Sequence, residues 1–297
     1  MHVALISLVF GLGACAIPEE PGDELAEVEQ GVDANNGKSL NGSTLNGTTL
    51  NGKSLNGKSL NGTSLNGKSL NGTAISASST TAPPLAGTGV VGSTWTGTTN
   101  TGDAVNLRVD TAAQGTGANA DLWFYRVSYQ TTTGWSPLCG VDGANVPIEA
   151  VTVAGRWSAT TVDSAYYNAP TTMFTFACRG KSIAKCVELG YKTYKGYSNQ
   201  MQACVRLLRA DFCGTGVSYT VDGTLLNLYD SVGVQPDTET WKLEAEWTIK
   251  GARCINSNNN ARYKLALSAD PKCTAPLQSS TCGNSFGTGA FLIDELP

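Results

Sequence analysis

The sequence is almost without histidine, and this scarcity excludes several kinds of chemistry. The single histidine among 297 residues is His2, at the extreme N-terminus. Ser-His-Asp and Cys-His nucleophilic mechanisms and histidine-ligated metal sites all require an imidazole in the folded domain. The sequence also has no C-x-x-C pair and no GxxxxGK[ST] loop, which argues against a cysteine-only zinc site and against a phosphate-binding P-loop. We therefore expect no bound metal and no cofactor.

The chain also lacks a clustered basic surface and an apolar run long enough to cross a bilayer. It has 20 lysines and arginines against 24 acidic residues, a net charge of −4, so nucleic acid is not an expected partner. Residues 3–14 form an apolar run of twelve, whereas a transmembrane helix needs about 20 residues. Such a run fits the hydrophobic core of a signal peptide.

The run ends in residues 12–15, Leu-Gly-Ala-Cys, which resemble the lipobox at which bacterial lipoproteins are processed. The resemblance implies that residues 1–14 are removed and that Cys15 is lipidated, tethering an exported protein to a membrane of the cell envelope. Ala16, rather than Asp, follows the cysteine, which in this family of signals implies the outer membrane or the cell surface. The usual positively charged segment before the run is missing. An ordinary secretory signal is the alternative.

A linker, a five-residue repeat and a second linker follow. Residues 15–35 are acidic and cannot bury enough apolar surface to fold. Residues 36–75 resemble pentapeptide-repeat proteins, whose chain winds into a right-handed β-helix. The β-helix would turn four lysines inward without acidic partners, so a flexible spacer is the alternative. Residues 76–89 predict a second linker. The apolar residues of the repeat recur every five positions: Leu40, Leu45, Leu50, Leu55, Leu60, Leu65, Leu70 and Ile75.

Residues 90–297 predict a folded domain that is mainly β or α+β. All six tryptophans lie there, and short β-like runs are separated by turns rich in Gly, Asn and Asp. Helical spacing of apolar residues predicts two short helices, over residues 182–189 and 199–210. Asp222-Gly223 predicts a tight hairpin turn between two strands. The expected strands are 104–109, 122–129, 148–153, 173–177, 217–221, 224–228, 241–248 and 290–293.

Apart from Cys15, every cysteine lies in this domain. An even number of cysteines in an exported chain indicates disulfides, here four of them. We expect these disulfides to fasten the two helices to the sheet, and we expect Cys204 to pair with Cys213 and Cys273 with Cys282. The eight candidates are Cys139, Cys178, Cys186, Cys204, Cys213, Cys254, Cys273 and Cys282.

Residues 204–213, CVRLLRADFC, carry a family resemblance. Together with KCVELGY at 185–191, YTVDGT at 219–224 and AEWTIKGARC at 245–254, they resemble the ADYC domain, a bacterial domain of unknown function named for an Ala-Asp-Tyr-Cys signature. The signature reads Ala210, Asp211, Phe212 and Cys213 in this chain, so Phe stands in place of Tyr. If the tyrosine hydroxyl has a chemical role in the family, this chain has lost it. The resemblance implies no particular activity.

Two functions stay open from the residues. In the first, the domain is a non-catalytic module that binds a glycan or a protein at the cell surface, or has a structural role there. Aromatic side chains could then form a binding platform. In the second, two carboxylates hydrolyse cell-wall or extracellular polysaccharide. The aromatic candidates are Trp123, Tyr125, Trp135, Trp157, Tyr166 and Tyr167, and the acidic candidates are Asp211, Asp222, Asp230, Glu244 and Glu246.

The surroundings of the acids should separate these two functions. Glu244 and Glu246 alternate with apolar residues, which predicts the solvent face of a strand. Asp211 follows the end of a helix and is expected to pair with Arg206 or Arg209. Two carboxyl groups facing each other across an open cleft would favour the hydrolase. Carboxylates bonded to arginines or backbone amides would favour the non-catalytic module, which is our expectation, with no catalytic residue.

Overall fold

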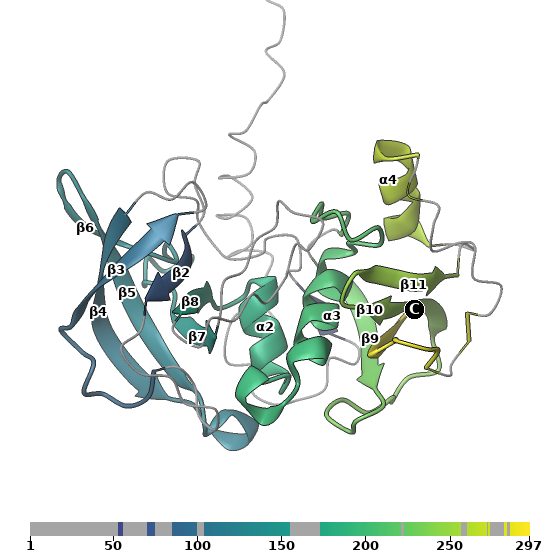
Figure 1. Ribbon diagram of the computed structural model, residues 1–297, viewed down its shortest axis with the longest axis horizontal. Coiled ribbons are helices and arrows are strands. Elements are labelled where there is room, and N and C mark those ends of the chain that lie inside the picture. The colour runs from purple at the N-terminus through teal and green to yellow at the C-terminus, as the bar shows by residue number, and fades with distance from the viewer. Residues whose placement is uncertain are drawn as a thin grey trace, which may run out of the picture.

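The computed structural model describes residues 53–55, 70–74, 85–99, 104–154, 173–220, 223–256, 260–271, 273, 282–283 and 286–297. Two β-sheets lie at opposite ends of the molecule, and two helices, α2 (Ser182–Glu188) and α3 (Ser198–Arg209), lie between them (Figure 1). The expectation of a β-rich, disulfide-stapled domain with short helices is confirmed.

The larger sheet has seven strands in the order β4-β3-β2-β8-β7-β5-β6. An additional antiparallel pairing of β4 with β5 closes the sheet on itself and leaves β6 as an edge strand, paired with β5. The loop between β4 and β5 contains a short 3-10 helix, η2 (Gly117–Asn119). The strands are β2 (Leu70–Ala74), β3 (Thr94–Thr99), β4 (Ala104–Gln114), β5 (Trp123–Thr131), β6 (Gly134–Pro137), β7 (Ala150–Ala154) and β8 (Met173–Cys178).

Strands β7 and β8 separate two hydrophobic cores. Phe174 and Phe176 of β8 belong to the core that the closed sheet encloses. Ala177 of β8, with Val151 and Val153 of β7, belongs to a second core shared with the helices. Successive side chains of a strand point to opposite faces, so these two strands contribute side chains to both cores. The helical layer therefore packs directly on the closed sheet.

An arginine reinforces this contact between sheet and helices. The guanidinium of Arg179, just after β8, lies 3.9 Å from the ring centroid of Phe124 on β5. It forms ion pairs with Glu149 at 2.7 Å and with the fully buried Glu188 of α2 at 2.9 Å. A buried carboxylate needs such a partner, because an unpaired charge away from water costs several kcal/mol. The contacts of Arg179 therefore hold α2 against the closed sheet.

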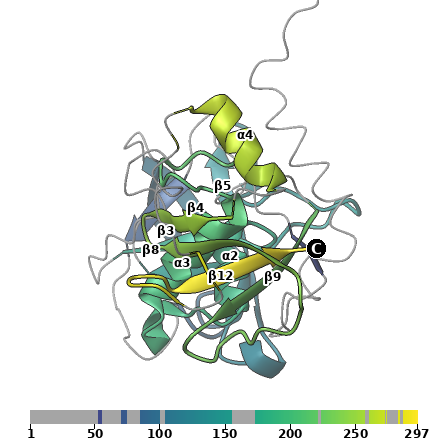
Figure 2. The ribbon, with the colours of Figure 1, turned by 90° about the vertical axis from the view of Figure 1, so that its right-hand side faces the viewer.

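The smaller sheet lies on the far side of α3. Its strands are β1 (Lys53–Leu55), β9 (Thr224–Asp230), β10 (Lys242–Thr248), β11 (Gly251–Ile255) and β12 (Leu292–Leu296), in the order β1-β9-β12-β10-β11. β12 lies between β9 and β10, although about 40 residues separate it from β10 in the sequence (Figure 2). A third helix, α4 (Ala261–Ala269), lies beside this sheet.

Most of the expected helices and strands are confirmed, but some elements were not expected and one expected strand is missing from the described residues. The sequence did not indicate β3, β6, β11 or α4, so the described residues contain three α-helices rather than two. Residues 217–220 form no strand, so the hairpin expected around Asp222-Gly223 is wrong on that side. Instead, the backbone N–H of Tyr219 donates to the carbonyl of Arg209 at 2.9 Å, which holds this segment against the end of α3. Asp222 itself lies outside the described residues.

The N-terminal expectations fall largely outside the described residues. These include the signal peptide 1–14, Cys15, the acidic linker and most of the repeat and second linker. Two pieces of the repeat are described, and each pairs with strands of the domain: β1 with β9, and β2 with β3 and β8. Leu85, near the end of the second linker, is buried in the core of the closed sheet. Within the described part, no helix is both long and apolar enough to span a membrane.

Four disulfides connect these elements, and they indicate an exported protein. The expectation that they fasten the two helices to the sheet is wrong, because Cys186–Cys204 joins α2 to α3. The expected pairs Cys204–Cys213 and Cys273–Cys282 are wrong. Cys204 lies on the face of α3 that meets α2, whereas Cys213 lies beyond the end of α3, so short sequence separation did not bring them together. The disulfides are Cys139–Cys178, Cys186–Cys204, Cys213–Cys273 and Cys254–Cys282, with Cα–Cα distances of 5.4 to 5.9 Å.

Replacing Cys186 and Cys204 together by alanine should destabilise the domain by about 3 kcal/mol, because an 18-residue separation is no longer closed in the unfolded chain. Urea unfolding of the double variant beside the wild type measures this loss. Non-reducing peptide mapping of the wild type should recover the four pairs and no free thiol in the domain. A Cys204–Cys213 peptide in that map would contradict the connectivity.

Candidate functional site

The family signature forms the turn that follows α3. Ala210 adopts a left-handed conformation with φ of 53° and ψ of 37°, which ends the helix. Asp211 comes next and is only 1% exposed. Its carboxylate forms an ion pair with Arg206 at 2.5 Å and accepts the backbone N–H of Gly216 at 3.0 Å. The expected pairing of Asp211 with a neighbouring arginine is therefore confirmed for Arg206, and the acid is sequestered from solvent.

Phe212, the third residue of the signature, is a core residue. Its ring is buried between Trp247 of β10 and Tyr263 of α4, with centroid distances of 5.1 and 5.3 Å. Its backbone carbonyl accepts the N–H of Ala252 on β11 at 2.9 Å. A ring in this position contributes packing. The aromatic residue of the signature therefore joins α3, the smaller sheet and α4.

The residues that follow complete the same junction. Cys213 forms its disulfide with Cys273, just after α4. Gly214 has φ of 66°, and a Cβ at this position would lie 1.9 Å from the carbonyl oxygen of Lys250, so only glycine allows the turn to approach the β10–β11 hairpin. The signature is thus a structural junction in this chain.

A buried arginine on α4 gathers two of the carboxylates. Arg262 is 3% exposed and forms ion pairs with Glu244 of β10 and, at 2.8 Å, with Asp294 of β12. Its guanidinium also donates to the carbonyl of Leu207 at 3.1 Å and to the hydroxyl of Thr220 at 3.3 Å. One side chain therefore links α4 to α3 and to two strands of the smaller sheet.

Asp294 holds its proton more strongly than an isolated aspartate. Burial raises the pKa of Asp294 well above its ordinary value of 3.8, and the neighbouring Glu244 raises it further, while Arg262 and the Trp247 N–H act in the opposite direction. The indole N–H of Trp247 donates to Asp294 at 2.7 Å. An acid with a raised pKa beside a second carboxyl is an arrangement that some enzymes use. Here both groups are fully buried and share an arginine.

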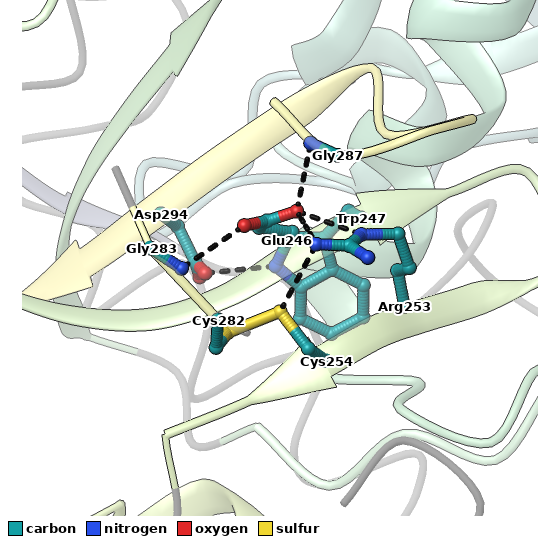
Figure 3. Close-up of a disulfide and its surroundings, with 8 residues drawn as sticks. All are labelled: Glu246, Trp247, Arg253, Cys254, Cys282, Gly283, Gly287 and Asp294. Atoms are coloured by element: carbon teal, nitrogen blue, oxygen red, sulfur yellow. Dashed lines mark hydrogen bonds and ion pairs between the residues drawn. A yellow bond between two sulfur atoms is a disulfide. The ribbon is translucent and has the colours of Figure 1, made fainter. Parts of the chain in front are cut away.

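Glu246 is a second buried carboxylate, and it lies beside a disulfide (Figure 3). Its oxygens accept from Arg253 at 2.8 Å and from the backbone N–H groups of Gly283 and Gly287 at 3.2 and 3.1 Å. The Cys254–Cys282 disulfide connects β11 to the segment that contains Gly283. Glu246 therefore fixes this segment, which leads into β12, on the sheet.

Glu246 and the two cysteines of this disulfide form the one group with metal-ligand spacing in the described part of the chain. The carboxylate of Glu246 and the sulfur atoms of Cys254 and Cys282 all lie within 4.8 Å of one another. Thiolate sulfur is the form that binds zinc, and the disulfide consumes both sulfurs. In addition, the Arg253 guanidinium already neutralises Glu246. The residues do not fit a metal ion in this state.

The four acidic candidates that the structure describes therefore do not converge on one site. Glu244 and Glu246 are 1% and 0% exposed, so the expectation that they lie on a wet strand face is wrong, because Arg262 and Arg253 cover them. The carboxylate of Asp230 accepts backbone N–H groups of residues 232, 234 and 235 and the hydroxyl of Tyr191. It organises the loop after β9.

The three aromatic candidates within the described residues do not form a common platform either. Tyr125 is completely buried in the core of the closed sheet, and Trp123 is partly buried against the same core. Trp157, Tyr166 and Tyr167 lie outside the described residues. Trp135 on β6 is the exception, because it is 36% exposed.

Comparison with known proteins identifies the family. The model of the ADYC domain matches residues 87–261, which is more than half of the chain, so the protein belongs to the ADYC domain family. The matched segment ends at the start of α4, before β12. No curated protein and no solved structure matches the chain.

Changing Asp211 to asparagine should lower the free energy of unfolding by about 3 kcal/mol, because the buried Arg206 loses its charged partner. Urea unfolding at pH 7 measures the loss. Glu239→Gln, in the partly exposed loop between β9 and β10, removes one negative charge without breaking a buried pair and serves as control. Equal stability of the two variants would contradict the structural role of the signature acid.

The raised pKa of Asp294 predicts a pH dependence of stability. Below pH 3.8 the residue is protonated in both states, and above it the unfolded chain releases the proton that the folded protein retains. The free energy of unfolding should therefore fall as the pH rises from 3.8 towards the folded-state pKa, and Asp294→Asn should remove that decrease. Urea unfolding between pH 3 and pH 8 tests this, and parallel profiles of the two proteins would contradict it.

Proposed function

We propose that this protein is a non-catalytic component of the bacterial cell envelope, lipid-anchored through Cys15, whose ADYC domain binds a ligand or has a structural role outside the membrane. One observation carries the proposal. Each described acidic candidate is neutralised by an arginine or occupied by backbone N–H groups: Asp211, Asp230, Glu244 and Glu246.

The burial and ion pairing of these acids argue against general acid–base catalysis. A catalytic carboxyl must reach a substrate atom, usually within hydrogen-bond distance or through one water molecule. Asp211, Glu244 and Glu246 are at most 1% exposed, and their ion pairs join different elements of the fold. Their charges are used to hold α3, α4 and the smaller sheet together.

The alternative, a carboxylate-dependent hydrolase of cell-wall or extracellular polysaccharide, has weaker support. Its best pair is Asp294 and Glu244, one with a raised pKa and the other ion-paired. A glycosidase needs room between its two carboxyls for a sugar and a water molecule. Here Arg262 contacts both carboxyls, so the pair favours a structural role.

The location in the envelope is supported by the leader and by the disulfides. Four structural disulfides are typical of proteins in an oxidising compartment outside the cytosol. A lipidated Cys15 would hold the domain at a membrane, and the acidic linker would separate the two, because its like charges favour an extended chain.

The full chain expressed in a bacterium with lipoprotein maturation should be found in the membrane fraction, and its N-terminal peptide should carry the mass of a diacylated or triacylated Cys15. Cys15→Ser should move the protein to the soluble fraction, because the acyl chains supply most of the membrane affinity. Cys139→Ser, which removes a cysteine of the domain, serves as control and should stay with the membrane.

Two outcomes would contradict this proposal. The first is an unmodified N-terminus in a protein recovered from the cytosol. The second is the release of soluble fragments from peptidoglycan or polysaccharide by the purified chain, with loss of that release in Asp294→Asn. The second outcome would establish the hydrolase instead.

A further inference from the structure

The outward face of strands β3 to β6 carries an exposed tryptophan among polar side chains. Leu107, Val109, Tyr125 and Val127 of β4 and β5 point into the closed sheet. The alternate residues of these strands point outward. We call this outward surface the polar face, and its members are Thr94, Thr96, Asn106, Arg108, Gln130 and Trp135.

Strand register aligns these side chains in rows. Thr96 of β3 is paired with Asn106 of β4, and Gln130 of β5 is paired with Trp135 of β6. The amide of Asn106 donates to the amide oxygen of Gln130 at 2.8 Å, which connects the two pairs. One row therefore crosses four strands, a distance of roughly 14 Å at the usual strand spacing, and ends at the tryptophan.

The ring of Trp135 packs against the guanidinium of Arg108, which is itself bound to a neighbouring carboxylate. The guanidinium of Arg108 lies 4.6 Å from the ring centroid of Trp135. Arg108 in turn donates to Asp110 at 2.6 Å, and Asp110 also accepts the hydroxyl of Ser128. The register of β4 with β5 shifts at Asp110, and such a bulge re-aims side chains locally. Arg108 supports one side of the ring, and Trp135 is still 36% exposed.

An exposed ring beside planar polar groups has the chemistry that recognises a sugar. The C–H groups on one side of a pyranose are attracted to the negative face of an aromatic ring. Neighbouring hydroxyls of the sugar can bond in pairs to planar amide, carboxylate and guanidinium groups. The polar face supplies an amide and a guanidinium beside Trp135, in Gln130 and Arg108. A ring already fixed by Arg108 loses little freedom on binding, which favours affinity.

We propose that the polar face binds a polysaccharide, with one sugar ring stacked on Trp135 and adjacent sugars contacting Gln130 and Asn106 along the row. This inference rests on the proposed non-catalytic function and names the ligand class of that function. It places the ligand on the closed sheet, at the opposite end of the molecule from the buried carboxylates of the smaller sheet (Figure 1).

Co-sedimentation of the purified full chain with cellulose, chitin, xylan and peptidoglycan sacculi tests the proposal. The wild type should sediment with at least one of these polymers, and Trp135→Ala should raise the Kd for that polymer at least tenfold. Gln130→Ala should weaken binding to a smaller extent. Leu265→Ala, which truncates an exposed apolar residue of α4 at 46% exposure, is the matched control and should bind like the wild type.

Polymer retention tests the sugar-binding face, and release of soluble sugar tests the non-catalytic function on which it rests. Thermal unfolding of each variant under non-reducing conditions checks that the fold is retained, since Trp135 and Gln130 are surface residues. Retention of no polymer by the wild type, or equal retention by Trp135→Ala, would overturn the sugar-binding face and leave the non-catalytic function standing. Time-dependent release of soluble sugar from a retained polymer would overturn the non-catalytic function instead.

Discussion

The ion pairs and hydrogen bonds of the Arg262 guanidinium hold together the second half of the molecule, which comprises α3, α4 and the smaller sheet. Arg262 is 3% exposed, so its donors must find acceptors inside the protein. It finds them on β10, β12 and α3, and it thereby joins elements that are far apart in the sequence. Arg206 joins α3 to the signature turn through Asp211, and Arg253 pairs with Glu246, whose carboxylate accepts the backbone N–H groups of Gly283 and Gly287 before β12. The hydrophobic core of this half is reinforced by ionic contacts and by disulfides that connect the same elements, so loss of one contact weakens several.

The two halves of the molecule are built in different ways. The closed sheet has a conventional apolar core, and hydrogen bonds between β4 and β5 remove most of its free edges. The smaller sheet places Glu244, Glu246 and Asp294 inside and relies on arginines to neutralise them. Charged groups inside a domain favour one arrangement of strands, because any other register would leave them unpaired. The polar face on β3 to β6, in contrast, includes no buried carboxylate among its described residues, and it is the surface that we propose for a ligand.

The sequence predicted local features well and long-range contacts poorly. The helices expected over 182–189 and 199–210 match α2 and α3 to within about one residue at each end, because helical spacing is a local property. The alternation around Glu244 and Glu246 gave the strand correctly, but its polar face is covered by arginines from elsewhere in the chain. The disulfide partners depend on tertiary packing in the same way. The helix α4 was not predicted because its apolar residues do not gather on one face: Leu265 is exposed, whereas the charged Arg262 is buried.

The central position of β12 has a consequence for how the protein is made. β12 pairs with β9 on one side and β10 on the other, so the smaller sheet has a gap until residues 292–296 arrive. A chain that crosses a membrane from its N-terminus delivers this strand after all the others. The oxidising machinery therefore meets Cys213 and Cys254 while the scaffold that should orient them is incomplete. Their partners, Cys273 and Cys282, also precede β12, so these sulfurs can meet before the complete sheet is there to orient them, whereas Cys139 and Cys178 belong to the closed sheet, which is delivered earlier.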